Sequence, residues 1–168
     1  FGIDPRSPAI SQISIQGEYS IEEEISWNWE LLEVPVSGLD HYEILISYGP
    51  VDSMSLSNMD PIATNSTSYV LRDELHDGYR YYARVKAISN NGISVLSNTS
   101  DRMIVDLSPP SKPSEVESDL VDRVNLTYKI EWTDSEDNIP YGLDHYQIMI
   151  NNQGDRWDLF DSTRSNSM

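Results

Sequence analysis

The sequence predicts an all-β chain that forms two tandem β-sandwiches, the second of them incomplete. Apolar and polar residues alternate along most segments, as in the run around Tyr42, Ile44 and Ile46, and this is the pattern of half-buried strands. Turn residues interrupt these segments at short intervals, and no segment has the apolar stripe of a helix. The pentapeptide GLDHY occurs at residues 38–42 and again at 142–146, which indicates an internal duplication.

The first copy is expected to contain seven strands and no helix. Asn91-Gly92 lies between two alternating runs and is the strongest hairpin signal in the chain. Seven short strands within about 100 residues are typical of a sandwich of two antiparallel sheets. The expected strands cover residues 10–16, 21–30, 40–48, 55–63, 68–72, 79–89 and 93–105.

Two proline-rich joints, Ile3 to Pro8 and Val105 to Pro113, precede the two copies. Neighbouring prolines exclude helix and favour extended backbone, so each joint is expected to act as a semi-rigid spacer. Trp29 and Trp132 lie 103 positions apart, close to the spacing of the GLDHY blocks. The predicted organisation is a linker from a preceding domain (1–8), a sandwich (9–106), a proline-rich linker (107–113) and the N-terminal part of a second sandwich (114–168).

The second copy repeats only the first four strands, expected near residues 114–119, 124–132, 143–151 and 156–160. It has no counterpart of residues 79–105, whose strands would be central to one sheet. We therefore expect further chain or a strand from a partner to complete it. The first ten residues lack the features of a signal peptide, so a mature chain or an interior piece of a longer protein is expected.

The segment LHDGYRYYARVKA, Leu75 to Ala87, resembles the signature of fibronectin type III domains, an immunoglobulin-like sandwich family. The resemblance implies that the hydroxyl of Tyr81 ties the corner before its strand back to the backbone. Asp77 stands where the family usually has proline, and Ala83 where it often has valine. The joint VDLSPPSKP is similar to connectors between such domains in large prokaryotic surface proteins. Core positions implied by the resemblance and the repeat are Trp27, Trp29, Tyr42, Leu75, Tyr81, Val85, Trp132 and Tyr146.

Composition limits the classes of partner. The chain has 28 acidic and 11 basic residues, a net charge of −17, so it repels nucleic acid and anionic membrane surfaces. It has no cysteine, which excludes disulfides, thiolate zinc sites and a cysteine nucleophile. No apolar run is long enough to span a membrane. The acidic residues indicate either a self-repelling soluble surface or sites for a divalent cation.

Candidate chemistry is sparse. No nucleophile, phosphate-binding or zinc-protease motif occurs, so no enzyme is predicted. Of the three histidines, His41, His76 and His145, the equivalent pair His41 and His145 has no second histidine or acid at helical ligand spacing and is expected to have a structural role. The segment TDSEDN places several oxygens in a short arc, which a calcium ion could use, although a solvated acidic turn is the alternative. The candidate ligands are Asp134, Glu136, Asp137 and Asn138. Asp4 and Asp106 in the joints are a second candidate, with hydrogen bonding to the following turn as the alternative.

Three sequons could accept N-linked glycans, at Asn65, Asn98 and Asn125. Asn65 is expected in a loop, Asn98 within the last strand of the first copy, and Asn125 at the start of a strand. The latter two could carry a sugar only if their side chains face outward.

The sequence predicts a non-catalytic extracellular spacer or adhesion module, a segment of a longer cell-surface or secreted protein. Its expected partners are neighbouring domains of the same chain, with a cell-surface protein or glycan as the external candidate. One alternative is a carbohydrate- or protein-binding accessory region of a secreted hydrolase, with Trp157, Tyr48 and Tyr141 as exposed aromatic residues. Another is a filament subunit that is completed by strand donation from a neighbour.

Overall fold

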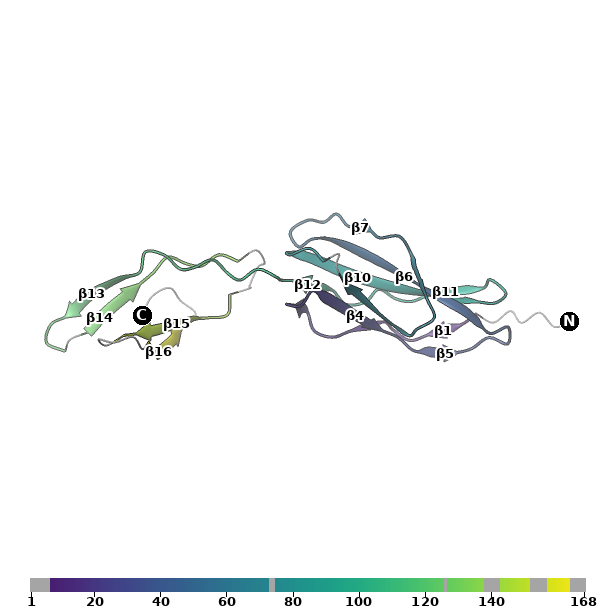
Figure 1. The fold of residues 1–168 in the computed structure, drawn as a ribbon, viewed down its shortest axis with the longest axis horizontal. Helices are drawn as coiled ribbons and strands as arrows, with labels where there is room; N and C mark the ends of the chain where they lie inside the picture. Colours follow the sequence, from purple (N-terminus) through teal and green to yellow (C-terminus); the bar gives the residue numbers. More distant parts are fainter. Residues whose placement is uncertain (1–6, 73–74, 126, 138–142, 152–156, 164–168) are drawn as a thin grey trace. The chain divides into compact units, whose positions relative to one another are not determined.

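The computed structural model describes residues 7–72, 75–125, 127–137, 143–151 and 157–163. These residues form strands, turns and irregular segments, and none of them is helical, so the predicted all-β class is confirmed. The chain divides into two compact units, unit 1 (Phe1–Leu107) and unit 2 (Ser108–Met168) (Figure 1).

One layer of unit 1 is a small antiparallel sheet with β4 (Glu24–Asn28) at its centre. β2 (Ser14–Ile15) pairs with one edge of β4 and β9 (Ser68–Arg72) with the other. β1 (Ala9–Ile10) pairs separately with β5 (Leu31–Glu33).

The opposing layer is a larger sheet in the order β3-β12-β10-β6-β7. β6 (Leu39–Pro50) and β10 (Tyr79–Ser89) pair antiparallel along their whole length and form its centre. The other pairings are antiparallel except that of β12 with β3, which is parallel. The shorter members are β3 (Tyr19–Ser20), β7 (Ser57–Asn58), β8 (Ile62–Thr64), β11 (Ser94–Leu96) and β12 (Met103–Val105).

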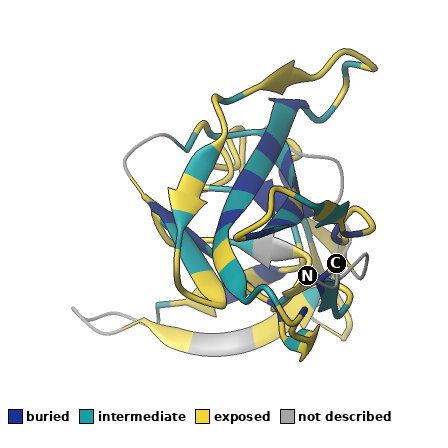
Figure 2. Cartoon of the chain, turned by 90° about the vertical axis from the view of Figure 1, so that its right-hand side faces the viewer, coloured by how far each residue is buried: buried dark blue, intermediate teal, exposed yellow. Residues whose placement is uncertain are grey.

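The core of unit 1 lies between these layers and follows the period-two pattern of the sequence, with buried and less buried residues alternating along the strands (Figure 2). Trp27 of β4 has no exposed surface, and Trp29 packs edge-to-face on Tyr42 at 5.5 Å and 73°. Each fully buried side chain of this size contributes roughly 1.5–3 kcal/mol. Buried residues from both layers include Ile25, Ile44, Ile46, Ala83, Val85 and Ala87.

The structure explains why residue 38, in the first GLDHY block, is a glycine. Gly38 has a φ of +80°, and a Cβ at this position would lie 2.7 Å from the side-chain nitrogen of Asn90. That same nitrogen donates a hydrogen bond of 2.7 Å to the backbone oxygen of Ser37. A side chain at residue 38 would therefore strain the backbone and displace Asn90, which joins the start of β6 to the turn after β10.

Strands 68–72 and 79–89 occur where the sequence predicts them, and strand 40–48 is extended to 39–50. The expected strand 21–30 is wrong at its start, because Ile21 is 80% exposed. The hydroxyl of Ser20 donates to the backbone oxygens of Glu22 and Glu24, both at 3.0 Å, and holds this segment in a turn. Regular pairing begins only at Glu24.

The expected strand 93–105 is divided into β11 and β12 by two serines. The hydroxyl of Ser97 accepts a hydrogen bond from the backbone N–H of Val85, and that of Ser100 accepts one from Ala83. The backbone N–H groups of both serines donate to the carbonyls of the same two residues. Two N–H groups in the middle of β10 are therefore satisfied by serine hydroxyls, where a regular partner strand would use its backbone carbonyls.

Two other expected strands are also divided. Residues 10–16 form β1 and β2. The backbone N–H of Ser11 donates to the carbonyl of Glu30, its hydroxyl accepts from the N–H of Glu30, and the chain then pairs with β4. Residues 55–63 become β7 and β8 with Pro61 between them, and proline has no N–H to offer a strand partner.

The corner before β10 has the contact that the family resemblance implies. The backbone N–H of His76 donates a hydrogen bond of 2.8 Å to the hydroxyl of Tyr81, which is fully buried. Gly78 follows with a φ of +73° and donates its N–H to the backbone oxygen of Val105. Leu75 is partly buried against the core.

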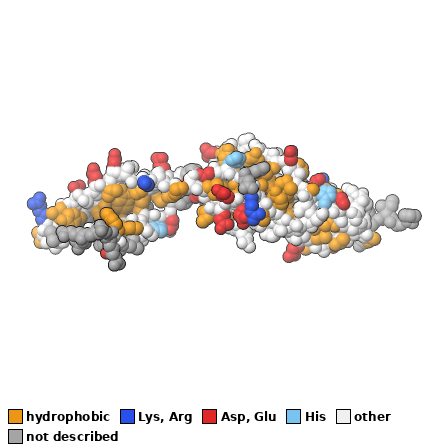
Figure 3. Space-filling model, viewed as in Figure 1, with side chains coloured by type: hydrophobic (Ala, Val, Ile, Leu, Met, Phe, Trp, Pro, Cys, Tyr) orange, Lys and Arg blue, Asp and Glu red, His pale blue; other side chains and the backbone are white. Residues whose placement is uncertain are grey.

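Unit 2 consists of two antiparallel hairpins in its described residues, β13 (Glu117–Asp122) with β14 (Thr127–Glu131), and β15 (Tyr146–Ile150) with β16 (Asp158–Thr163). Each of these strands begins two or three residues after the start of its expected range. Trp132 packs edge-to-face on Tyr146 at 5.3 Å and 68°, as Trp29 does on Tyr42. Hydrophobic side chains gather on this unit between the hairpins (Figure 3).

Replacing Tyr81 with phenylalanine should lower the free energy of unfolding of unit 1 by about 1–2 kcal/mol, because the backbone N–H of His76 loses its acceptor. Urea denaturation followed by tryptophan fluorescence would measure the change. Tyr82→Phe, on the outer face of the same strand, is the control and should change stability much less. Equal effects of the two substitutions would contradict this role of Tyr81.

Candidate functional site

The acidic loop of unit 2, Thr133 to Asp137, directly follows Trp132 and is held by Tyr146. The backbone N–H of Ser135 donates a hydrogen bond of 2.8 Å to the hydroxyl of Tyr146, and this hydroxyl lies 3.2 Å from a carboxylate oxygen of Asp134, to which it donates. Packing against Trp132 fixes the ring of Tyr146. The Trp–Tyr pair therefore positions the loop through a single hydroxyl.

The proline-rich segment at the start of unit 2 is fastened to the same loop. Ser111 donates its backbone N–H to the carbonyl oxygen of Glu136 at 2.8 Å, and its hydroxyl accepts from the N–H of Glu136 at 2.7 Å. A further bond of 2.8 Å joins the N–H of Thr133 to the carbonyl of Ser114. The sequence did not reveal these bonds, because they join residues about 20 positions apart without a recognisable motif.

Three of the predicted calcium ligands lie in this acidic loop, Asp134 and Glu136 exposed and Asp137 half-buried. Asp134 directs one carboxylate oxygen to Tyr146, while the carboxylate-bearing residue Glu136 is exposed. Among the described residues, no group of three or more His, Cys, Asp or Glu side chains could hold a metal ion. Asn138 and Asp4 lie outside the described residues, and Asp106 donates its N–H to the carbonyl of Ser20. Calcium binding stays a prediction.

All three sequon asparagines are exposed, and two of them differ from their expected settings. Asn65 lies in the turn between β8 and β9, as expected. Asn98 lies between β11 and β12 and not within a strand, and the hydroxyl of Ser100, the third residue of its sequon, is buried against β10.

Asn125 lies in the turn between β13 and β14 and not at the start of a strand. Its side-chain nitrogen donates a hydrogen bond of 2.6 Å to the carboxylate of Asp122. The backbone and side-chain N–H groups of Asn125, followed by the N–H of Val124, lower the pKa of that carboxyl group. A glycan on Asn125 would use a nitrogen that already stabilises this turn, so Asn65 is the least constrained acceptor.

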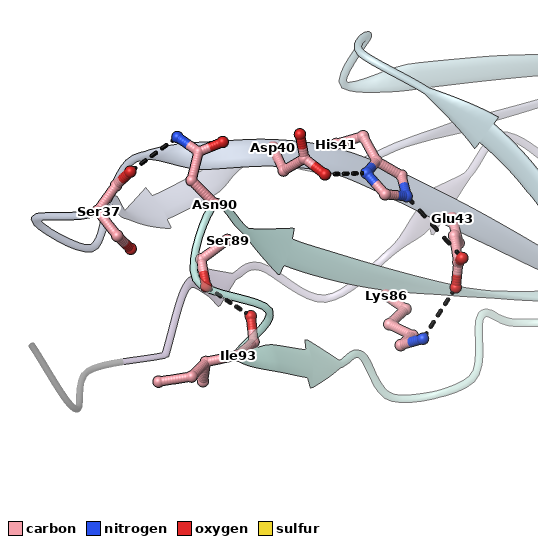
Figure 4. Close-up of polar contacts among 8 residues, drawn as sticks. All are labelled: Ser37, Asp40, His41, Glu43, Lys86, Ser89, Asn90 and Ile93. Carbon is pink, nitrogen blue, oxygen red and sulfur yellow. Dashed lines mark hydrogen bonds and ion pairs between the residues drawn. The ribbon is translucent and has the colours of Figure 1, made fainter.

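His41 belongs to a polar chain on the outer face of the larger sheet (Figure 4). Its Nδ1 lies 2.9 Å from the carboxylate of Asp40 and its Nε2 lies 3.9 Å from Glu43. Glu43 in turn pairs with Lys86 at 2.9 Å across β6 and β10. The hydrogen bond from Lys86 is the main cause of the lowered pKa of the Glu43 carboxyl group. These contacts agree with the structural role expected for His41.

His145 repeats part of this arrangement, since its Nδ1 lies 2.7 Å from the carboxylate of Asp144. Gln147 takes the place of Glu43, and its side-chain nitrogen lies 3.4 Å from Nε2 of His145. His76 stacks with Tyr48 at 6.1 Å in the corner before β10.

The three aromatic residues considered for ligand binding have different settings. Tyr48 is only partly exposed and is stacked on Tyr81 at 5.7 Å and 10°, and a role in ligand binding stays a prediction for it. Trp157 is 63% exposed, and Tyr141 lies outside the described residues.

Sequence reasoning did not find a groove of about 510 Å³ on the outer face of unit 1. Its lining includes Leu45, Met54, Leu56, Arg80, Tyr82 and Arg84. The sequence feature that could have indicated this groove is the series Arg80, Tyr82 and Arg84 at every second residue of β10. This spacing places two cationic side chains and an aromatic ring on one face of the sheet.

No protein-family model matches the chain, and no curated protein matches its sequence. Among solved structures, the chicken CNTN1 FN1–FN3 domains match at 16% identity and a TM-score of 0.43 over 96% of this chain and 54% of that chain. A myokine structure matches at 22% identity and a TM-score of 0.35, over 58% of this chain and 92% of that one. Domains A168–A170 from titin match at 17% identity and a TM-score of 0.35, over 59% of this chain and 30% of that chain.

This chain therefore spans about half the length of the CNTN1 structure. At these identities and scores the matches are likenesses of fold, and they do not assign a ligand or a partner. Within the described residues, no helix is long and apolar enough to cross a membrane.

The pair between Glu43 and Lys86 should contribute about 0.5 kcal/mol of pH-dependent stability. Since the pKa of Glu43 is lowered in the folded state, this contribution is present above the ordinary glutamate pKa and is lost as pH falls through the folded value. A double-mutant cycle of Glu43→Gln and Lys86→Met, measured by urea denaturation, should give coupling at pH 7 that disappears at strongly acidic pH. Coupling that is independent of pH would contradict this account.

Replacing Tyr146 with phenylalanine should release the acidic loop, because Ser135 and Asp134 both lose a hydrogen bond. Amide hydrogen exchange at Ser135 should become at least about tenfold faster, the equivalent of roughly 1.4 kcal/mol. Tyr128→Phe, whose side chain is 59% exposed, is the control in the same unit. Unchanged exchange at Ser135 would show that the hydroxyl does not hold the loop.

Proposed function

We propose that this chain is a non-catalytic structural segment of a longer cell-surface or secreted protein and that it serves as an extracellular spacer or adhesion module. The observation that carries the proposal is the repeated Trp–Tyr packing, Trp29 on Tyr42 and Trp132 on Tyr146, in two units that follow a proline-rich segment. Repeating one sandwich extends a chain without adding a catalytic site, and this is how spacer proteins are built.

The use of polar side chains supports the same function. The hydroxyls of Tyr81, Ser97 and Ser100 are committed to backbone N–H groups in unit 1, and that of Tyr146 is committed in unit 2. Groups that in an enzyme would serve as nucleophiles or acids here stabilise turns and strand edges.

The net charge of −17 suits an extracellular module that must stay dispersed at a crowded surface, because like charges keep copies apart. Exposed Asn65 offers a glycan acceptor that would add to this effect. Both features support display outside the cell.

Ligand binding is the second candidate function, and the groove over β6 and β10 favours it. Its volume of about 510 Å³ falls in the range of small-ligand sites, and Tyr82 lies between two arginines that would attract carboxylates. An acidic glycan or peptide is the ligand class that this chemistry fits.

The proposed location can be tested by treating intact cells of the native source with trypsin. Peptides of this chain should be released from unbroken cells, and deglycosylation should lower the mass of the peptide that carries Asn65. A cytosolic protein, analysed in parallel, should release none. Recovery of the chain only after lysis would contradict an extracellular spacer. Binding of an acidic glycan that is lost in the Tyr82→Ala variant would favour the second candidate instead.

A further inference from the structure

The outer face of β10 carries basic side chains, and the register of β10 with β6 decides which of them is paired with a carboxylate. Lys86 lies opposite Glu43 and forms an ion pair of 2.9 Å with it. Arg84, two residues earlier on the same face, lies opposite Leu45, so β6 offers it no carboxylate. In a chain with 28 acidic and 11 basic residues, an arginine without an acidic partner is unexpected.

The charged end of Arg84 is available to a ligand. Its Nε donates a hydrogen bond of 3.3 Å to the backbone oxygen of Ser97, which anchors the side chain at the flank of β10. Within the part of the chain that the structure describes, its two terminal nitrogens have no hydrogen-bond or ion-pair partner, and the residue is exposed. A guanidinium in this state can donate the two parallel hydrogen bonds that a carboxylate accepts.

The loop after β6 forms the neighbouring part of the groove. Gly49 allows its close approach, because a Cβ at this position would lie 2.5 Å from a backbone oxygen of the loop and 3.2 Å from the side chain of Leu56. The guanidinium of Arg80 fastens the loop by donating a hydrogen bond to the backbone oxygen of Ser53. The loop thereby presents two exposed apolar side chains, Met54 and Leu56, to the groove.

The polar lining of the groove distinguishes a peptide from a glycan. A sugar ring presents several hydroxyls, and each one that is buried without a partner weakens binding. The described lining residues include no Asp, Glu, Asn or Gln. The hydroxyl of Ser47 already donates a hydrogen bond of 2.6 Å to the side chain of Asn58, which leaves those of Tyr82 and Thr99 among the described lining residues. A carboxylate beside an aliphatic side chain fits this lining better than a ring of hydroxyls does.

The groove is complete within unit 1. It lies on the outer face of the larger sheet, while the inner face of that sheet is covered by the core, with Val85 and Ala87 fully buried. The contacts that shape the groove, made by Gly49, Arg80 and Arg84, all join residues of unit 1. No further segment of this chain is therefore needed to close the fold at this place, and the surface is ready for a separate partner.

We propose that this groove binds a short acidic segment of a partner protein, with a carboxylate on the guanidinium of Arg84 and an adjacent aliphatic side chain against Leu45 and Leu56. The inference rests on ligand binding, the second candidate function, and narrows its ligand to an acidic peptide. Binding of this kind makes unit 1 the adhesive element of the proposed spacer.

The peptide Gly-Leu-Glu-Leu-Gly, with both ends blocked, is the probe, and Gly-Leu-Gln-Leu-Gly is its uncharged control. In nuclear magnetic resonance titrations of the isotope-labelled chain at low salt, the glutamate peptide should shift the amide signals of residues 53–56 and 80–84, with a Kd on the order of 1 mM or tighter. The glutamine peptide should bind at least about tenfold more weakly, because it offers Arg84 no charged acceptor.

Variants of the chain locate the binding surface. Arg84→Gln should weaken binding of the glutamate peptide at least about tenfold. Arg72→Gln is the matched control, since it removes the same charge from β9 in the other sheet, where Arg72 pairs with Glu24, and this variant should bind normally. Circular dichroism checks that both variants fold, and the comparison of the two peptides on the unchanged chain stands even if one does not.

Three results would overturn the proposal. Equal binding of the two peptides, or no binding of either, would mean that the groove does not recognise an acidic peptide. Tighter binding of a glucuronate oligosaccharide than of the glutamate peptide would assign the groove to a glycan, and the second candidate function would then stand without this inference. Failure of the protein from its native source to bind a peptide that this chain binds would mean that another segment of the same protein occupies the groove. The extracellular location is tested separately, by trypsin treatment of intact cells.

Discussion

The edge-to-face contact between a tryptophan that follows one strand and a tyrosine at or near the start of the next long strand organises both units. Trp29 and Tyr42 are almost fully buried, and their contact fixes how β6 lies against the layer of β4. The register of β6 then sets that of β10, its partner over the whole strand. The contact has a cost, since a buried indole N–H without a protein acceptor is unfavourable, and those of Trp29 and Trp132, like that of Trp27, have none among the described residues. The large apolar area of each ring offsets it.

The long strands were more predictable from the sequence than the places where a strand breaks or turns. Alternation over many residues located β9 and β10 to the residue, because their burial is set by a whole sheet face. Alternation failed where one hydroxyl redirects the backbone, as Ser20, Ser97 and Ser100 do. A serine in a polar position of a strand and a serine that ends a strand look alike in sequence, so only the fold distinguishes them.

The candidate sites show the same limit. The sequence located the acidic loop but not the contacts that hold it. The hydroxyl of Tyr146 accepts from the N–H of Ser135, 11 positions away, and packing on Trp132 orients the ring that carries this hydroxyl. The groove beside Tyr82 was missed because charged residues on an exposed strand face are usually solvated. The repeat itself was informative, because it allows equivalent positions to be compared: Tyr146 is buried as Tyr42 is, whereas Ile150 is 41% exposed and its counterpart Ile46 is 1% exposed.

The serine contacts along β10 also bear on how a repetitive chain avoids misassembly while it is being synthesised. Neighbouring sandwiches of related sequence can exchange strands before each has folded, and an unsatisfied strand flank is where such exchange begins. In unit 1 the hydroxyls of Ser97 and Ser100 occupy the N–H groups of Val85 and Ala83 from within the same segment of chain. A local contact of this kind forms early, because little chain entropy is lost in closing so short a loop. The N–H groups of Val85 and Ala83 are thereby satisfied within unit 1 and offer no donor to a strand of another sandwich.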